Sequence, residues 1–137
     1  MPNAIAVLVG RILLSAIFLI SGIHSLTDIA STAGYFEGLG LPVPQMTAWA
    51  SAVFEVAAGL CVLIGFQTTP VAVLLAAYCV SAGYLGHYGQ GGDDPMLSLM
   101  HTQAFMKDLG LAGAFLILAV FGPGSLSVDG RRQVVEA

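Results

Sequence analysis

Seven side chains of this chain could take part in acid–base or ion-pair chemistry within a mostly apolar sequence. They are one arginine, one lysine, two carboxylates and three histidines: Arg11, Lys107, Glu55, Asp108, His24, His87 and His101. Such groups can pass protons, hydrogen-bond the head group of a quinone or bind a transition metal. No HxxxH or HxxE spacing, catalytic-serine motif, phosphate loop or zinc motif accompanies them. We therefore treat them as candidates for ligand binding or proton handling, with no metal site expected and no catalytic residue assigned.

Glu55 lies near the middle of residues 47–66, an apolar run long enough to cross a bilayer core of roughly 30 Å. A charge at that depth costs roughly 2.5–3.5 kcal/mol on insertion scales, so Glu55 should face other helices and be paired or protonated. Its expected partner is Lys107, Asp108 or the polar head group of a ligand. Small residues that let helices approach closely share its flank: Ala48, Ser51, Ala52, Ala58 and Gly59.

Arg11 lies two turns inside the first apolar run. Helical spacing places it on one stripe with Ser15, Phe18 and Gly22. One interpretation is that its side chain extends to the near membrane interface. The other is that it turns inward as a counter-charge. The small residues Ser15 and Gly22 on the stripe favour the inward interpretation.

The composition predicts a membrane protein. Hydrophobic residues make up 57% of the chain and charged residues 9%, whereas soluble domains carry about 25% charged residues. The formal charge of −4, without a basic cluster, argues against nucleic acid as a partner. We predict one all-α domain over residues 1–137, an up-and-down bundle of four transmembrane helices in a lipid bilayer. The expected elements are helices over 4–23, 47–66, 70–88 and 98–121, an outer loop over 24–46 and a mobile polar tail over 122–137.

The basic residues predict the orientation of this bundle. With four spans, the N-terminus, the short loop at Gln67 and the tail with Arg131 and Arg132 share one side of the membrane. The opposite loops hold acidic residues and no Lys or Arg. The positive-inside rule then places both termini in the cytoplasm.

This orientation gathers most of the polar candidates in the outer half of the membrane. His24 and His87 end helices and His101 begins one, all at the outer end, while Glu55 and Asp108 lie somewhat deeper. The group could form a proton path, bind a quinone head group or hold a metal. It could equally consist of interfacial histidines and one internal ion pair between Glu55 and Lys107.

Four blocks of sequence resemble the DoxX family of small bacterial membrane proteins. They are GRILLSAIFLISGIHSL at 10–26, YFEGLGLPVP at 35–44, FEVAAGLCVLIGFQTTP at 54–70 and FMKDLGLAGAFLILAVFGPGSLSVDG at 105–130. The resemblance implies a four-helix protein of the bacterial inner membrane. Some family members form the membrane subunit of a thiosulfate:quinone oxidoreductase, and others are associated with redox-stress complexes. Polar positions of the family fall on Arg11, Glu55, Lys107 and Asp108, whereas Ser25, Gln67 and Thr69 stand where relatives often carry basic residues.

Two functions of different classes follow from the sequence. The first is the membrane subunit of a quinone-linked or redox-stress oxidoreductase complex, with soluble redox proteins as partners. The second is a non-catalytic membrane scaffold or small-molecule carrier, in which a Glu55–Lys107 pair only fixes the register of the helices. Either protein could form a homo-oligomer. Co-purified quinone would favour the first.

Overall fold

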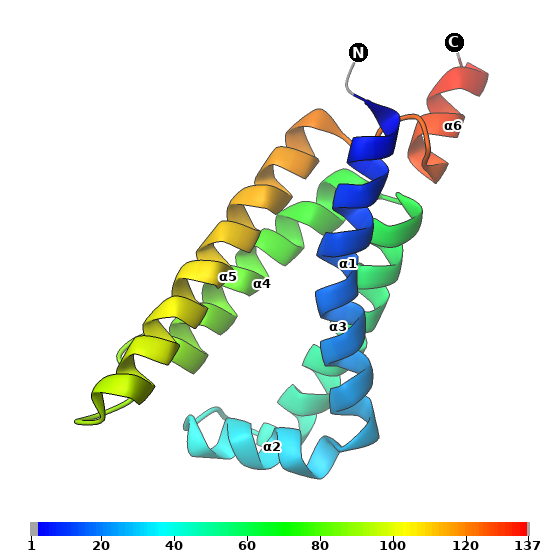
Figure 1. Ribbon diagram of the computed structural model, residues 1–137. Helices are drawn as coiled ribbons and strands as arrows, with labels where there is room; N and C mark the ends of the chain where they lie inside the picture. The colour runs from blue at the N-terminus through cyan, green and yellow to red at the C-terminus, as the bar shows by residue number, and fades with distance from the viewer. Residues whose placement is uncertain (1–2, 137) are drawn as a thin grey trace. The chain divides into compact units, whose positions relative to one another are not determined.

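The computed structural model describes residues 3–136 and, of these, the side chains of residues 3–132. The described residues form helices joined by short connections (Figure 1). Four of these helices are long and apolar enough to cross a membrane, which confirms the predicted all-α class with four transmembrane helices. The helices are α1 (Ala4–Thr27), α2 (Ile29–Gly38), α3 (Pro44–Ile64), α4 (Thr68–His87), α5 (Pro95–Phe121) and α6 (Val128–Glu136).

The helix boundaries differ from the sequence expectation where capping residues set them. Helix α3 begins at Pro44, earlier than expected. Proline is favoured at the first helical position, because it has no backbone N–H group and an N–H group there would have no partner within the helix. The Asp94 carboxylate accepts hydrogen bonds from the amides of Met96 and Leu97 and so begins α5. Asp28 ends α1 and caps α2 through the amide of Ser31. The expected outer loop over 24–46 therefore holds the last turn of α1 and the whole of α2.

The chain divides into two compact units. The first contains α1, α2, α3 and α6, and the second contains α4 from Thr69 onward together with α5. Each unit is described by itself below. How the two units pack into a bundle stays a prediction.

In the first unit, α1 packs along α3 (Figure 1). The buried residues of α1 are Arg11, Ser15, Phe18 and Gly22, the stripe predicted from helical spacing. Gly22 lies so close to α3 that an added Cβ would be 3.0 Å from the Ala52 carbonyl oxygen and 2.8 Å from a methyl of Val56. Small residues on α3 permit this approach: of the five that the sequence predicted, Ala48, Ala52, Ala58 and Gly59 are buried and Ser51 is half-buried.

In the second unit, α4 and α5 are joined by a short loop and pack on each other. Thr69 Oγ1 donates a hydrogen bond of 3.1 Å to the carbonyl of Ala119, which joins the start of α4 to the end of α5. Near the other end, Gly83 lies against Asp108 and Phe105. Cys79 is buried, as expected for a small apolar side chain.

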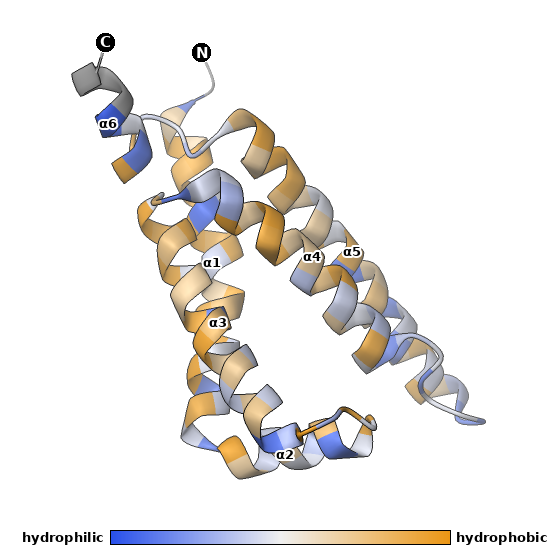
Figure 2. Ribbon diagram, turned by 180° about the vertical axis from the view of Figure 1, so that it is seen from behind, coloured by the Kyte–Doolittle hydropathy of each residue, from blue (hydrophilic) through white to orange (hydrophobic). Residues whose placement is uncertain are grey.

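The apolar surfaces of the long helices remain largely exposed. Figure 2 shows hydrophobic residues along α1, α3, α4 and α5, and hydrophilic residues in α6. At most 33% of the most apolar stretch of any of these four helices is buried within the chain. In a bilayer, these exposed side chains contact lipid at no cost in hydrophobic free energy.

Candidate functional site

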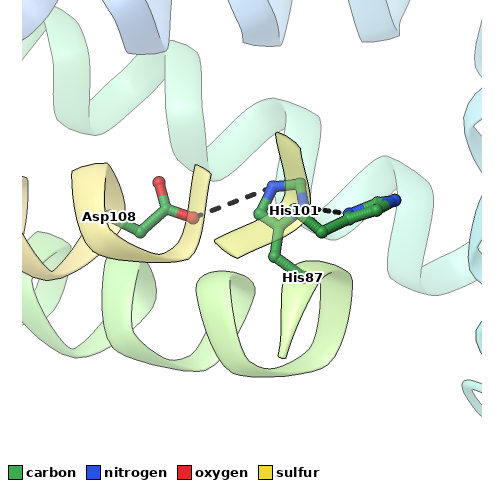
Figure 3. Close-up of polar contacts among 3 residues, drawn as sticks. All are labelled: His87, His101 and Asp108. Atoms are coloured by element: carbon green, nitrogen blue, oxygen red, sulfur yellow. Dashed lines mark hydrogen bonds and ion pairs between the residues drawn. The ribbon is translucent and has the colours of Figure 1, made fainter. Parts of the chain in front are cut away.

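Three polar residues of the second unit meet near the loop that joins α4 to α5 (Figure 3). His87 Nδ1 lies 3.0 Å from His101 Nδ1, and His87 Nε2 lies 3.9 Å from an Asp108 carboxylate oxygen. The imidazole of His87 therefore stands between the other imidazole and the carboxylate. Because a hydrogen bond between two Nδ1 atoms needs one donor, only one of the two imidazoles carries the shared proton.

Helical periodicity explains why these three side chains meet. His101 and Asp108 are seven residues apart on α5, which places them about two turns apart on one face. His87 lies in the last turn of α4 and reaches between them. The relative exposure is 30% for the His87 side chain and 25% for that of Asp108. The site is thus partly sheltered and still accessible to a ligand or to water.

Gly83 lets α5 come close enough for this contact. A Cβ added at Gly83 would be 2.8 Å from the Asp108 Cβ and 3.0 Å from one of its carboxylate oxygens. Aromatic rings border the same end of the unit. Tyr88 stacks on Tyr84 with ring centroids 5.2 Å apart and meets the edge of Phe105 at 5.5 Å.

The remaining candidates lie elsewhere. His24 is exposed in the last turn of α1, within the first unit. Lys107 is exposed on α5 beside Asp108. Glu55 is half-buried on α3, where its Cβ faces Gly22 of α1. Its pairing with Lys107 or Asp108, which belong to the second unit, stays a prediction.

Arg11 turns inward, with 1% of its surface exposed. Arg11 therefore faces inward, as the second interpretation predicted, but the partners of Arg11 belong to the C-terminal segment. Arg11 Nη2 donates to the carbonyl of Leu126, and the Asp129 carboxylate attracts the guanidinium. Nη1 packs in the space where a side chain at Gly65 would begin. Burial removes the water that would hydrate the guanidinium, which costs free energy. The contacts with Leu126 and Asp129 offset part of this cost.

Asp129 is a residue that the sequence analysis missed. Its carboxylate accepts hydrogen bonds from the amide of Gln67 (3.1 Å) and from the amide and hydroxyl of Thr68 (both 2.8 Å). Its own amide donates to the carbonyl of Gly65 at 2.9 Å. Asp129 therefore caps the first turn of α4 from a distant part of the sequence. No local pattern signals this contact, because Asp129 and Thr68 lie 61 residues apart in the sequence.

The electrostatics of Asp129 agree with this geometry. Desolvation raises the pKa of the Asp129 carboxyl, but the hydrogen bonds from Thr68 and Gln67 and the charge of Arg132 lower it by more. The net pKa of Asp129 lies below its ordinary value. The carboxylate is therefore charged at neutral pH.

The C-terminal segment is thus an ordered part of the first unit. Ser127 is buried, its hydroxyl donates to the carbonyl of Gly124 and accepts from the amide of Gly130, and Arg132 lies 5.4 Å from the centre of the Phe66 ring. The expectation of a mobile polar tail over 122–137 does not describe these residues. Hydrogen bonds donated by Arg11 and Thr68 to this segment, and one that the segment donates to the Gly65 carbonyl, explain the difference, since they offset the entropy lost on ordering.

The described part of the chain contains no group of three His, Cys, Asp or Glu side chains that could hold a metal ion. The site can instead accept, donate and share protons between imidazole and carboxylate groups. Residues 3–136 include four helices that are long and apolar enough to span a membrane, and one pair of them carries a small polar cluster. The protein is therefore a helical membrane protein.

Comparisons with known proteins agree with this class. The sequence model of the DoxX family matches residues 6–88. Inner membrane protein YphA of Escherichia coli K12 is 35% identical over 129 residues, which cover 93% of this chain and 90% of YphA. Inner membrane protein YqjF of the same organism is 35% identical over 130 residues, which cover 91% of this chain and 90% of YqjF. No solved structure matches the chain. The chain belongs to the DoxX family, which confirms the resemblance described above.

Proposed function

We propose that this protein is an inner-membrane subunit of a quinone-linked oxidoreductase complex and that its α4–α5 pair handles protons for a bound quinone. The single observation that carries the proposal is the position of His87 between His101 and Asp108. The names of YphA and YqjF support the inner membrane as the location.

The proposal assigns each of the three residues a role. Reduction of a quinone to a quinol takes up two electrons and two protons, so the protein must supply protons at the quinone oxygens. In the proposed arrangement, His101 hydrogen-bonds a quinone oxygen and donates a proton to it. Before this transfer His87 would be protonated, with Asp108 stabilising its positive charge, and it would pass its proton to His101 through their shared hydrogen bond as His101 gives up its own. His87, which is partly exposed, would then regain a proton from water, and a second transfer of the same kind would supply the second proton of the quinol. The electrons come from a soluble redox partner.

The surroundings of the cluster support a ring-shaped ligand. Tyr84, Tyr88 and Phe105 present aromatic rings at the same end of the helical pair. Aromatic rings attract one another in stacked and edge-to-face arrangements worth roughly 0.5–1.5 kcal/mol each. A quinone ring could use the exposed faces of Tyr84 and Tyr88 in this way.

Extraction of the purified protein tests the proposal. Mass spectrometry of its lipid extract should find a quinone, and His101→Gln should lower the amount of quinone per protein. Thr102→Ala is the matched control, since Thr102 is exposed and its hydroxyl donates to the carbonyl of Ser98 one turn earlier. Wild-type protein without quinone, even after reconstitution with quinone-containing lipid, would favour the alternative, a non-catalytic scaffold or a carrier of another ligand.

A further inference from the structure

The first unit contains a group of hydrogen-bond donors that all bond to one carboxylate of the same chain. The donors are the amide of Gln67 and the amide and hydroxyl of Thr68, all bonded to Asp129. They lie where α4 begins, and amides at a helix start favour negative charge because of their unpaired N–H groups and the helix dipole. We call these donors, together with Arg11, the anion cradle.

Arg11 provides a second, independent sign of an anion site. Its side chain is almost fully buried, yet Nε and Nη1 have no hydrogen-bond partner among the described residues. Nη1 lies at Gly65, whose carbonyl accepts from the amide of Asp129. A buried guanidinium with two idle nitrogens is costly. The contacts with Leu126 and Asp129 therefore leave hydrogen-bond donors of the Arg11 guanidinium unused.

The position and charge of the cradle indicate its ligand. Residues 65–67 join the end of one membrane-spanning helix to the start of the next, so they lie at the membrane interface, where lipid phosphates are found. The chain has four Lys and Arg residues in all, and three of them, Arg11, Arg131 and Arg132, lie in this unit. Basic residues near a membrane surface attract anionic lipids.

We propose that the anion cradle binds the phosphate of an anionic phospholipid and that Asp129 occupies it as an internal substitute. The strap formed by residues 124–132 then has two states. In the closed state, Asp129 fills the cradle and the strap covers Arg11. In the open state, a lipid phosphate accepts the hydrogen bonds of Gln67 and Thr68 and also reaches the idle nitrogens of Arg11.

The strap is suited to opening. Of its described side chains, Ser127 is the one that is buried, and Arg131 and Arg132 are exposed. Contacts of Asp129, Leu126 and Arg132 hold it in place against the rest of the unit. A phosphate can replace the Asp129 carboxylate at the donors of Gln67 and Thr68. Opening also breaks the bond from the Asp129 amide to Gly65 and the bond from Arg11 to Leu126, and new bonds from Arg11 to the phosphate would replace them.

The test removes Asp129 and supplies an anion in its place. Asp129→Ala is placed in nanodiscs of phosphatidylcholine, in nanodiscs with phosphatidylglycerol, and in phosphatidylcholine nanodiscs with added inorganic phosphate, and the Tm is measured in each. We expect a lowered Tm in phosphatidylcholine and recovery of at least half of the loss with phosphatidylglycerol. Asp28→Ala is the control, since Asp28 also caps a helix but has no arginine at that cap. The decrease in Tm caused by Asp28→Ala should be the same in all three nanodisc conditions.

The outcomes separate the sources of the anion. Recovery with inorganic phosphate in neutral lipid would overturn the lipid assignment in favour of soluble phosphate, and no recovery in either arm would overturn the site. If Asp129→Ala does not fold, Asp129→Asn enters the same comparison, because it keeps the shape and removes the charge. In the wild-type protein, amide exchange of residues 124–132 should be faster with phosphatidylglycerol than without it. Equal exchange would overturn the two-state strap.

Discussion

At the scale of single residues, Asp129 shows how a polar contact stabilises a membrane protein outside the bilayer core. Two backbone amides and one hydroxyl donate to its carboxylate, and these bonds hold its pKa below the ordinary value despite desolvation. The same carboxylate attracts the buried guanidinium of Arg11. One side chain thus joins α6 to the turn between α3 and α4.

The lowered pKa of Asp129 predicts a pH dependence of stability. Its ionised form is favoured in the folded state, so its contribution is fully present above the unfolded pKa of about 3.9 and is lost as the pH falls through the folded value. We expect Asp129→Asn to lower the Tm at pH 6 and the gap to the wild type to close at acidic pH. Thermal unfolding in detergent at a series of pH values checks this. A gap that persists unchanged at low pH would contradict it.

Gly65 leaves no room for a side chain. Its φ of +69° costs a non-glycine residue roughly 1–2 kcal/mol. An added Cβ would also overlap Arg11 Nη1 and the Ser127 Cβ. Gly65→Ala should therefore unfold the protein at a clearly lower temperature. Gly40→Ala is the control, with φ of +74° and nothing within 4 Å of an added Cβ, so it reports the backbone cost alone.

At the scale of elements, close approach between helices depends on glycine at the contact. Gly22 faces Val56 and Glu55 of α3, and Gly83 faces Asp108 and Phe105 of α5, and each glycine leaves room for these side chains. Helices in lipid gain little from the hydrophobic effect when they associate, so packing at such positions supplies much of their affinity.

Gly22→Ala should weaken the contact between α1 and α3. Its Cβ would meet the backbone oxygen of Ala52, which cannot rotate away, and overpacking of this kind costs about 1–3 kcal/mol. Gly10→Ala on the same helix has open space and exchanges glycine for a better helix former, so it should be neutral or slightly stabilising. Unfolding by denaturant in mixed micelles compares the two. Equal effects would show that Gly22 is no contact point.

At the scale of the whole molecule, the number of spans and the basic residues set the expected orientation. Four crossings place both ends of the chain on one side of the membrane. Arg11, Arg131 and Arg132 lie near that side, and the loop between α4 and α5 carries Asp93 and Asp94. The positive-inside rule then predicts cytoplasmic termini.

Cysteine labelling in intact cells tests this orientation. In a background with Cys61→Ala and Cys79→Ala, a membrane-impermeant maleimide should label Asp93→Cys from outside and Arg131→Cys only after the membrane is opened. Labelling of both positions from the same side would contradict four crossings. The reversed pattern would contradict cytoplasmic termini while keeping four crossings.

The sequence by itself determined the local features of this protein. Apolar runs of membrane-spanning length predicted four helices, and a spacing of three and four residues predicted the buried stripe with Arg11 and Gly22. The same periodicity placed His101 and Asp108 on one face. These features follow from the geometry of a single helix, which the sequence alone specifies.

Only the tertiary structure decided which distant groups meet. It joined His87 to His101 and Asp108 and left His24 exposed on α1, although all three histidines were candidates at one end of the bundle. It gave Arg11 the C-terminal segment as its partner, where the sequence suggested a mobile tail. Such pairings depend on the conformation of turns, such as the left-handed Gly65 that brings Thr68 to Asp129. A turn places side chains that are far apart in the chain, and helical periodicity carries no information about them.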